Sequence, residues 1–295
     1  MYPHLFTIGD FTVTSFGLMM FLAFIGGAWV LARQFEKRDM DPEHAWDMLI
    51  WIAIGGILGA KLYYVALHPA DLAADPLGAL TSRGGLVWYG GFIGGVLAFY
   101  WQVRKRNLSL AGTFDSAAPA LALAYGIGRM GCFLVGDDYG RPTDSWIGIA
   151  FPEGYPPTTA GYFRSIGYEI AADVPDSAVL AVIPTQLFDI AAGLIMFGIL
   201  WRLSGSLRAG RLFAVYLVLY GVERFVIEFY RAKTDFIALG LTTSQVASIL
   251  LLAIAVVIWQ RTAAAPAPAG QGTGGGPDRG SDGATRQDDT AAPGG

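Results

Sequence analysis

Residues 128–143 read GRMGCFLVGDDYGRPT, and they pass from an apolar helix end into a polar loop. The first half suits a membrane helix, and the second half, rich in Gly, Asp and Pro, suits the turn that follows it. Arg129 stands inside the apolar half. A charge at that position is costly unless it faces a partner or a wet cavity. The stretch therefore indicates a helical membrane protein with a polar interior.

The composition of the whole chain indicates the same class. Of the 295 residues, 54% are hydrophobic and 15% are charged, and the mean hydropathy of +0.45 is too high for an ordinary soluble domain. The single cysteine, Cys132, excludes an internal disulfide and a four-cysteine metal site, and the three histidines lie far apart. The charges form no acidic or basic block. These features argue against a zinc enzyme and against a nucleic-acid partner.

Seven segments approach the length of a membrane span, which takes about 20 mainly apolar helical residues. They lie at about 16–33, 46–67, 86–102, 114–134, 184–201, 211–230 and 242–260. We therefore predict an all-α polytopic membrane protein with about seven transmembrane helices.

Basic residues in the short loops predict the orientation of these helices. They follow the first, third, fifth and seventh segments: Arg33, Lys37, Arg38, Arg104, Lys105, Arg106, Arg202, Arg208, Arg211 and Arg261. We expect those loops in the cytoplasm and the amino terminus outside. The first segment lacks the flanking signals of a cleaved signal peptide, so we expect it to be retained.

Two stretches fall outside the predicted spans. Residues 135–183 are expected on the outer face and are rich in Gly, Pro and aromatic residues, so we expect a small cap there. Residues 262–295 bury too little apolar surface to offset the entropy of ordering them. The prediction is a transmembrane domain at 1–261, which includes the cap, and a disordered cytoplasmic tail at 262–295.

Glycines recur every four residues in the second and third segments. The pairs are Gly55 with Gly59, Gly90 with Gly94, and Gly91 with Gly95. Such spacing lets two helix backbones approach closely. A second interpretation is that the bare backbone lines a passage for a lipid headgroup, and the sequence leaves both open.

Ionisable residues inside the predicted spans indicate function more strongly. They are Lys61, Asp115, Arg129, Asp189, Glu223, Arg224 and Glu228, with Asp137 and Arg231 at outer ends. In the sixth segment, Tyr220, Arg224, Glu228 and Arg231 fall on one helical stripe. Arg224 and Glu228 can pair along it, and a purely structural ion pair is one interpretation.

Arg129 and Arg224 suggest a sharper one. Both are expected in the outer halves of their spans, where two guanidiniums can clamp a lipid phosphate at headgroup depth. Asp137 and Asp138 could bind Ca²⁺ or Mg²⁺, but two adjacent carboxylates form a weak metal motif. We therefore predict an anion site and no metal.

At these residues the chain resembles a known family, the bacterial prolipoprotein diacylglyceryl transferases. The family signature runs Gly-Arg-x-Gly-Asn-Phe, three residues, then Glu-x-x-Gly-Arg, and GRMGCFLVGDDYGR (128–141) matches it in register. Further matching pieces, in order over about residues 1–260, are FGLMMFLAF, GAKLYYV, GGLVWYGGFIGG, DSAAPALALAYGIGR, PTQLFD and ERFVIEFYRAKTD.

The resemblance implies a multi-pass enzyme of the bacterial cytoplasmic (inner) membrane that uses no cofactor. Its partners would be phosphatidylglycerol and prolipoprotein signal peptides. It would join the diacylglyceryl group to the lipobox cysteine as a thioether and release glycerol phosphate. Arg129 and Arg224 match the two key arginines of the family, which would stabilise the leaving phosphate. Glu228 and Arg231 would orient Arg224 and extend the positive field.

The resemblance also implies the remaining site residues. The catalytic set would include Tyr89 and Asp137, and the substrate-binding set Phe16, Gly90, Gly91, Cys132, Gly140, Gln186 and Tyr220. Five positions depart from the family: Tyr89, Cys132, Asp137, Phe16 and Ile183 stand for histidine, asparagine, glutamate, tyrosine and histidine. A phenol with its ordinary pKa near 10 is a poor base. The substrate thiol would then be activated in one of two ways. Either the nearby arginines lower the pKa of Tyr89 so that it acts as the base, or their positive field ionises the thiol directly.

Three functional classes follow. The first is an active diacylglyceryl transferase. The second is a diverged paralogue that uses the same lipid pocket for another acceptor or for lipid binding alone. The third is an anion channel or transporter, which the chain disfavours because it shows no obvious internal repeat.

Overall fold

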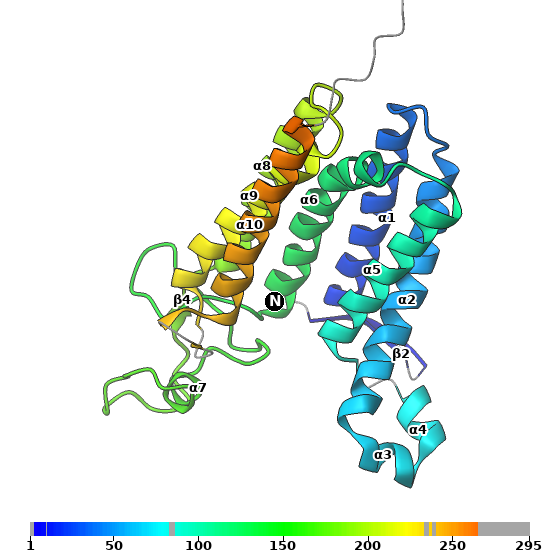
Figure 1. Ribbon diagram of the computed structural model, residues 1–295. Coiled ribbons are helices and arrows are strands. Elements are labelled where there is room, and N and C mark those ends of the chain that lie inside the picture. The colour runs from blue at the N-terminus through cyan, green and yellow to red at the C-terminus, as the bar shows by residue number, and fades with distance from the viewer. Residues whose placement is uncertain (1–2, 10, 83–85, 233–235, 238–239, 265–295) are drawn as a thin grey trace, which may run out of the picture. The chain divides into compact units, whose positions relative to one another are not determined.

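The computed structural model describes residues 3–9, 11–82, 86–232, 236–237 and 240–264 (Figure 1). Within them, five helices are long and apolar enough to cross a membrane. They are α1 (Ser15–Glu36), α2 (Glu43–Leu67), α6 (Leu110–Val135), α8 (Thr185–Leu203) and α10 (Thr243–Ala264). Each coincides with a predicted segment, so the prediction of a mainly helical membrane protein is confirmed.

The other two predicted spans are also helices, but they are shorter. α5 (Trp88–Lys105) has 18 residues with basic residues in its last turn, and α9 (Arg211–Ile227) has 17. At 1.5 Å per residue α9 is about 26 Å long, less than a typical hydrocarbon core. The sixth predicted segment, 211–230, instead finishes in a 3-10 turn, η1 (Glu228–Tyr230). Helix length and composition support five spans, and the count of seven stays a prediction.

α6 lies between two groups of helices (Figure 1). It packs against α1 in one group and against α8 and α9 in the other, while α2 packs against α5 and α1. Buried apolar side chains fill both contacts: Val30, Phe35, Met48 and Ala117 in the first, and Ala122, Leu200, Leu212 and Ala255 in the second. Because α6 belongs to both cores, its carboxyl end is held from two directions.

Glycines bring α2 and α5 into backbone contact. A Cβ added to Gly90 would lie 2.3 Å from the carbonyl oxygen of Gly59, and one added to Gly94 would lie 2.1 Å from that of Gly55. A Cβ on Gly91 would lie 3.3 Å from the carbonyl oxygen of Gly56. Of the two interpretations of these glycines, the structure supports close helix packing.

One intramembrane carboxylate has a structural role. Asp115 on α6 is 3% exposed, and its two oxygens accept hydrogen bonds from the backbone N–H groups of Gly210 (2.7 Å) and Phe213 (2.9 Å). It therefore caps the first turn of α9 from a neighbouring helix. Gly210 has φ 88°, a left-handed conformation that glycine adopts at little cost.

Short elements complete the fold. β1 (His4–Ile8) and β2 (Phe11–Thr14) form an antiparallel hairpin before α1, and α3 (Pro69–Ala74) and α4 (Pro76–Thr81) follow α2. The 135–183 segment contains β3 (Ile149–Ala150), α7 (Ala160–Ser165) and β4 (Ala181–Val182), with β3 and β4 antiparallel. Its own apolar cluster includes Tyr139, Phe151, Phe163 and Val182. Of the tail predicted at 262–295, residues 262–264 instead belong to α10, and residues 265–295 lie outside the described part of the chain.

Candidate active site

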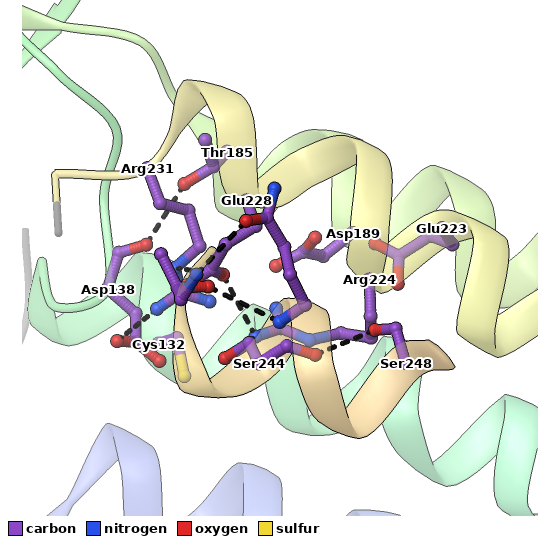
Figure 2. Close-up of polar contacts among 12 residues, drawn as sticks. Cys132, Asp138, Thr185, Asp189, Glu223, Arg224, Glu228, Arg231, Ser244 and Ser248 are labelled. Carbon is purple, nitrogen blue, oxygen red and sulfur yellow. Dashed lines mark hydrogen bonds and ion pairs between the residues drawn. The ribbon is translucent and has the colours of Figure 1, made fainter. Parts of the chain in front are cut away.

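The polar centre of the molecule lies where α6 ends. Gly136, with φ 70°, closes α6 in the left-handed conformation typical of a helix C-cap, and its N–H bonds the carbonyl of Cys132 at 2.9 Å. The chain then turns past Asp137 and Asp138 toward the start of α8 and the end of α9. Figure 2 shows the side chains that converge there from these elements and from α10.

Arg129 is held by two carboxylates. Its Nη1 lies 2.9 Å from Asp138 Oδ2, and its Nε lies 3.1 Å from Asp189 Oδ2. Nη1 also contacts the sulfur of Cys132 at 3.8 Å. The Arg129 side chain is 13% exposed and that of Asp189 is fully buried. The arginine that the sequence placed inside an apolar helix is therefore paired, as a buried charge must be.

Arg224 and Glu228 form the ion pair that their spacing predicts, at 3.3 Å. Arg224 also donates to Ser244 Oγ at 3.2 Å, and Thr242 Oγ1 donates to Glu228 Oε1 at 3.1 Å. The start of α10 thus holds both members of the pair in place. Arg224 Nη1 is buried and has no hydrogen-bond partner among the described residues.

Arg231 reaches the site by a different route from the one predicted. It is not on the α9 stripe, because α9 ends at Ile227 and Arg231 follows the 3-10 turn in extended conformation. A β-bridge joins its backbone to Gly140. Its side chain is 2% exposed and forms an ion pair with Asp138 Oδ1, and its Nε lies 4.0 Å from Glu228 Oε2.

The two adjacent aspartates of the loop differ in their contacts. Among the described residues, the carboxylate that forms ion pairs with Arg129 and Arg231 is that of Asp138, one residue beyond the position that matches the family signature. Burial acts to raise the pKa of Asp138, but Arg231 and Arg129 outweigh it and hold that pKa well below its usual range. Burial raises the pKa of Asp137, against which the Cys132 thiol and the two arginines act.

Side-chain hydrogen bonds fix the backbone of this loop. Gln186 Nε2 donates to the carbonyl of Asp137 at 2.6 Å, and Thr185 Oγ1 donates to the carbonyl of Asp138 at 2.9 Å. Both donors belong to the first turn of α8. Gln186, which the resemblance assigned to substrate binding, acts here on the loop that carries the aspartates.

Several neighbours of the arginines were given no role in the anion site predicted from the sequence. They are Tyr125, Asp138, Asp189, Glu223, Thr242 and Ser244. Tyr125 donates to Glu223 at 3.2 Å and lies beside Tyr220, with ring centroids 5.3 Å apart. The sequence did mark Asp189 and Glu223 as candidates for a functional site, because each is a carboxylate inside an apolar span. Nothing in the sequence marked Thr242 or Ser244 in this way.

Four predicted residues lie on α1 and α5, two helices that do not carry the arginines. Tyr89, 57% exposed, and Gly90 and Gly91 lie at the start of α5, which packs against α2. Phe16 on α1 packs near Gly131, where an added Cβ would be 3.2 Å from its ring. Cys132, Gly140 and Tyr220 do lie beside the arginines.

Cys132, Asp137 and Asp138 are the group of described residues whose chemistry could hold a metal ion, since their ligand atoms lie within 4.8 Å of one another. The fit is poor because Asp138 already pairs with two guanidiniums, which repel a cation.

The arrangement of the arginines suits an anion better than a cation. Three buried or nearly buried arginines converge, and one of them, Arg231, lines a cavity of about 240 Å³ together with Glu228 and Thr242.

Comparisons with known proteins point to one family. A family model described as prolipoprotein diacylglyceryl transferase matches residues 3–261. A Clostridium tetani protein named phosphatidylglycerol–prolipoprotein diacylglyceryl transferase is 31% identical over 260 residues, covering 88% of this chain and 97% of the relative. Proteins with the same name from Pseudomonas paraeruginosa (32% identical, 90% of this chain and 96% of the relative) and Pseudomonas putida (33%, 87% and 92%) are also similar.

Proposed function

The chain belongs to the prolipoprotein diacylglyceryl transferase family, and on this premise we propose that phosphatidylglycerol and a lipobox cysteine are its two substrates. Family membership makes it a membrane transferase of lipoprotein biosynthesis. The proposed reaction replaces the bond between the glyceryl carbon and the phosphate oxygen by a carbon–sulfur bond. The sulfur bonds to the glyceryl carbon as a thioether, glycerol phosphate leaves with the electrons of the broken carbon–oxygen bond, and the thiol proton passes to the leaving phosphate or to water.

The convergence of Arg129, Arg224 and Arg231 supports this proposal most strongly. Negative charge grows on the phosphate as it leaves, and fixed cations in a water-poor site stabilise it most at that moment. Two of the three side chains are only 12–13% exposed, so their field is little screened. Arg224 Nη1, with no hydrogen-bond partner among the described residues, offers a further donor to an anion.

A direct test is complementation. The chain is expressed in cells depleted of their own transferase and supplied with labelled phosphatidylglycerol and a lipobox substrate. We expect a thioether-linked lipoprotein and released glycerol phosphate. If the protein is present in the membrane but no thioether product forms, the proposed activity is excluded.

A second candidate is a paralogue that binds the same lipid without activating a thiol. Tyr89 and Cys132 favour it, because they stand where the family carries histidine and asparagine. Under this proposal the variant Tyr89→His with Cys132→Asn gains transferase activity that the parent lacks. A parent that is already as active as the double variant excludes it.

For the transferase, we propose that the arginine field activates the acceptor thiol. The variant Tyr89→Phe should then keep kcat/KM within about threefold of the parent, whereas loss of a general base costs about 10²–10⁴-fold. Tyr100→Phe, an exposed tyrosine on the same helix, is the matched control. A hundredfold loss in Tyr89→Phe alone would show that the phenol takes the thiol proton.

We also propose seven spans in the bacterial cytoplasmic membrane, with the amino terminus and the 135–183 cap outside. The loop between α5 and α6 is then cytoplasmic. In a Cys132→Ala background, Ser145→Cys should react with a membrane-impermeant maleimide in intact spheroplasts, and Asn107→Cys only after permeabilisation. Labelling of both from outside would contradict the predicted arrangement of spans between them.

A further inference from the structure

The arginine centre contains more carboxylates than guanidiniums. Around Arg129, Arg224 and Arg231 stand Asp137, Asp138, Asp189, Glu223 and Glu228. The guanidiniums that would attract a phosphate are therefore already paired with carboxylates. A phosphate and a carboxylate that contact the same guanidinium repel each other strongly in a site of low dielectric. An anion that binds the paired guanidinium nitrogens therefore has to displace a carboxylate from them.

Exposure identifies which carboxylate can move. Three carboxylates form ion pairs with the arginines, and the side chains of Asp189 and Glu228 are fully buried whereas that of Asp138 is 41% exposed. Glu228 is held further by the hydroxyl of Thr242. The cations that Asp138 bridges are much less exposed, 13% for Arg129 and 2% for Arg231. The anion is thus the accessible member of this bridge.

The backbone of Asp138 can stay in place while its side chain turns. Its carbonyl accepts a hydrogen bond from Thr185, and the preceding carbonyl accepts one from Gln186. Its φ of 55° lies in the left-handed region, which aspartate tolerates better than most residues. Rotation of the side chain alone would carry the carboxylate away from the arginines.

We propose that the Asp138 carboxylate is a resident counter-anion, which bridges Arg129 and Arg231 until the phosphate of the substrate displaces it. Its two oxygens contact the two guanidiniums as two non-bridging phosphate oxygens would. The exchange lowers the affinity for every phosphate and lets only a ligand with additional contacts, such as membrane-anchored chains, compete well. The identity of that ligand as a phospholipid rests on the proposed function; the exchange itself does not.

The test uses the full-length protein in nanodiscs with the neutral variant Asp138→Asn and the charge-retaining variant Asp138→Glu. We expect Asp138→Asn to lower the KM for phosphatidylglycerol about three- to tenfold with kcat little changed. The phosphate no longer has to break a partly exposed ion pair, whose free energy corresponds to about that change in affinity. Inorganic phosphate and glycerol phosphate should protect this variant from thermal unfolding at correspondingly lower concentrations. Asp138→Glu should resemble the parent.

The control is Asp144→Asn, which removes the same charge from an exposed position of the same segment. It should leave the KM and the phosphate protection unchanged. If Asp144→Asn changed the KM and the phosphate protection as much as Asp138→Asn does, the effect would come from the overall charge of the segment, and the proposal would be overturned. So would a KM that is unchanged or raised in Asp138→Asn, as a purely structural bridge predicts, or a fall in kcat alone, as a general base predicts.

Two outcomes separate this inference from the proposed function. If no chain transfers lipid but inorganic phosphate still protects Asp138→Asn better than the parent, the inference holds and the proposed reaction fails. If lipid transfer occurs but the affinity for phosphate does not depend on the charge at position 138, the proposed reaction holds and the inference fails. If Asp138→Asn and Asp138→Ser both fail to fold while Asp138→Glu folds, the carboxylate is structural and the inference is overturned.

Discussion

Replacing Arg129 with alanine is expected to lower kcat/KM for lipid transfer by about 10²–10³-fold, as does removal of one group that stabilises a developing oxyanion. Arg224→Ala should have an effect of similar size. Both guanidiniums are nearly buried, so water replaces them poorly. Steady-state transfer with labelled phosphatidylglycerol measures the loss, and binding of inorganic phosphate by the same variants should weaken in parallel.

Lysine variants separate charge from geometry. Arg129→Lys and Arg224→Lys keep the positive charge but lose the planar fork that contacts two oxygens at once, so they should recover only part of the activity. Arg33→Ala removes an exposed arginine, 52% exposed beside Glu36, and should behave like the parent. Unchanged phosphate binding in both alanine variants would remove the phosphate clamp as an explanation of this site.

Replacing Asp115 with alanine is expected to destabilise the protein by about 2–3 kcal/mol, because two buried N–H groups lose their acceptor. Those groups belong to Gly210 and Phe213 at the start of α9, and Asp115 lies at the other end of α6 from the arginines. The midpoint of thermal unfolding in detergent should fall clearly. Activity per folded molecule at low temperature should not change.

Two variants keep this second prediction specific. Asp115→Asn retains one acceptor oxygen and should lose less stability than Asp115→Ala. Asp173→Ala, at an exposed position of the 135–183 segment, should shift stability by about 0.5 kcal/mol or less. A large loss of activity per folded molecule in Asp115→Ala would instead place this carboxylate in the reaction pathway.

Much of the fold was predictable because its signals are local. Within the described residues, apolar runs identified the seven helices of 17 or more residues, five of which are long and apolar enough to cross a membrane. The spacing of Arg224 and Glu228 predicted their ion pair, which depends on a single helix. The length of α9 was overestimated, because hydropathy does not distinguish an α-helix from the 3-10 turn at Glu228–Tyr230.

The sequence by itself determined that this is a helical membrane protein, that Arg129 and Arg224 are charges needing buried partners, and that the chain resembles the transferase family. Only the tertiary structure decided which partners they have. Asp138, rather than Asp137, bridges Arg129 and Arg231, and Asp189 holds the other edge of Arg129. Those contacts join residues from different elements. They depend on how the chain turns at Gly136 and after Ile227, which hydropathy and helical spacing do not specify.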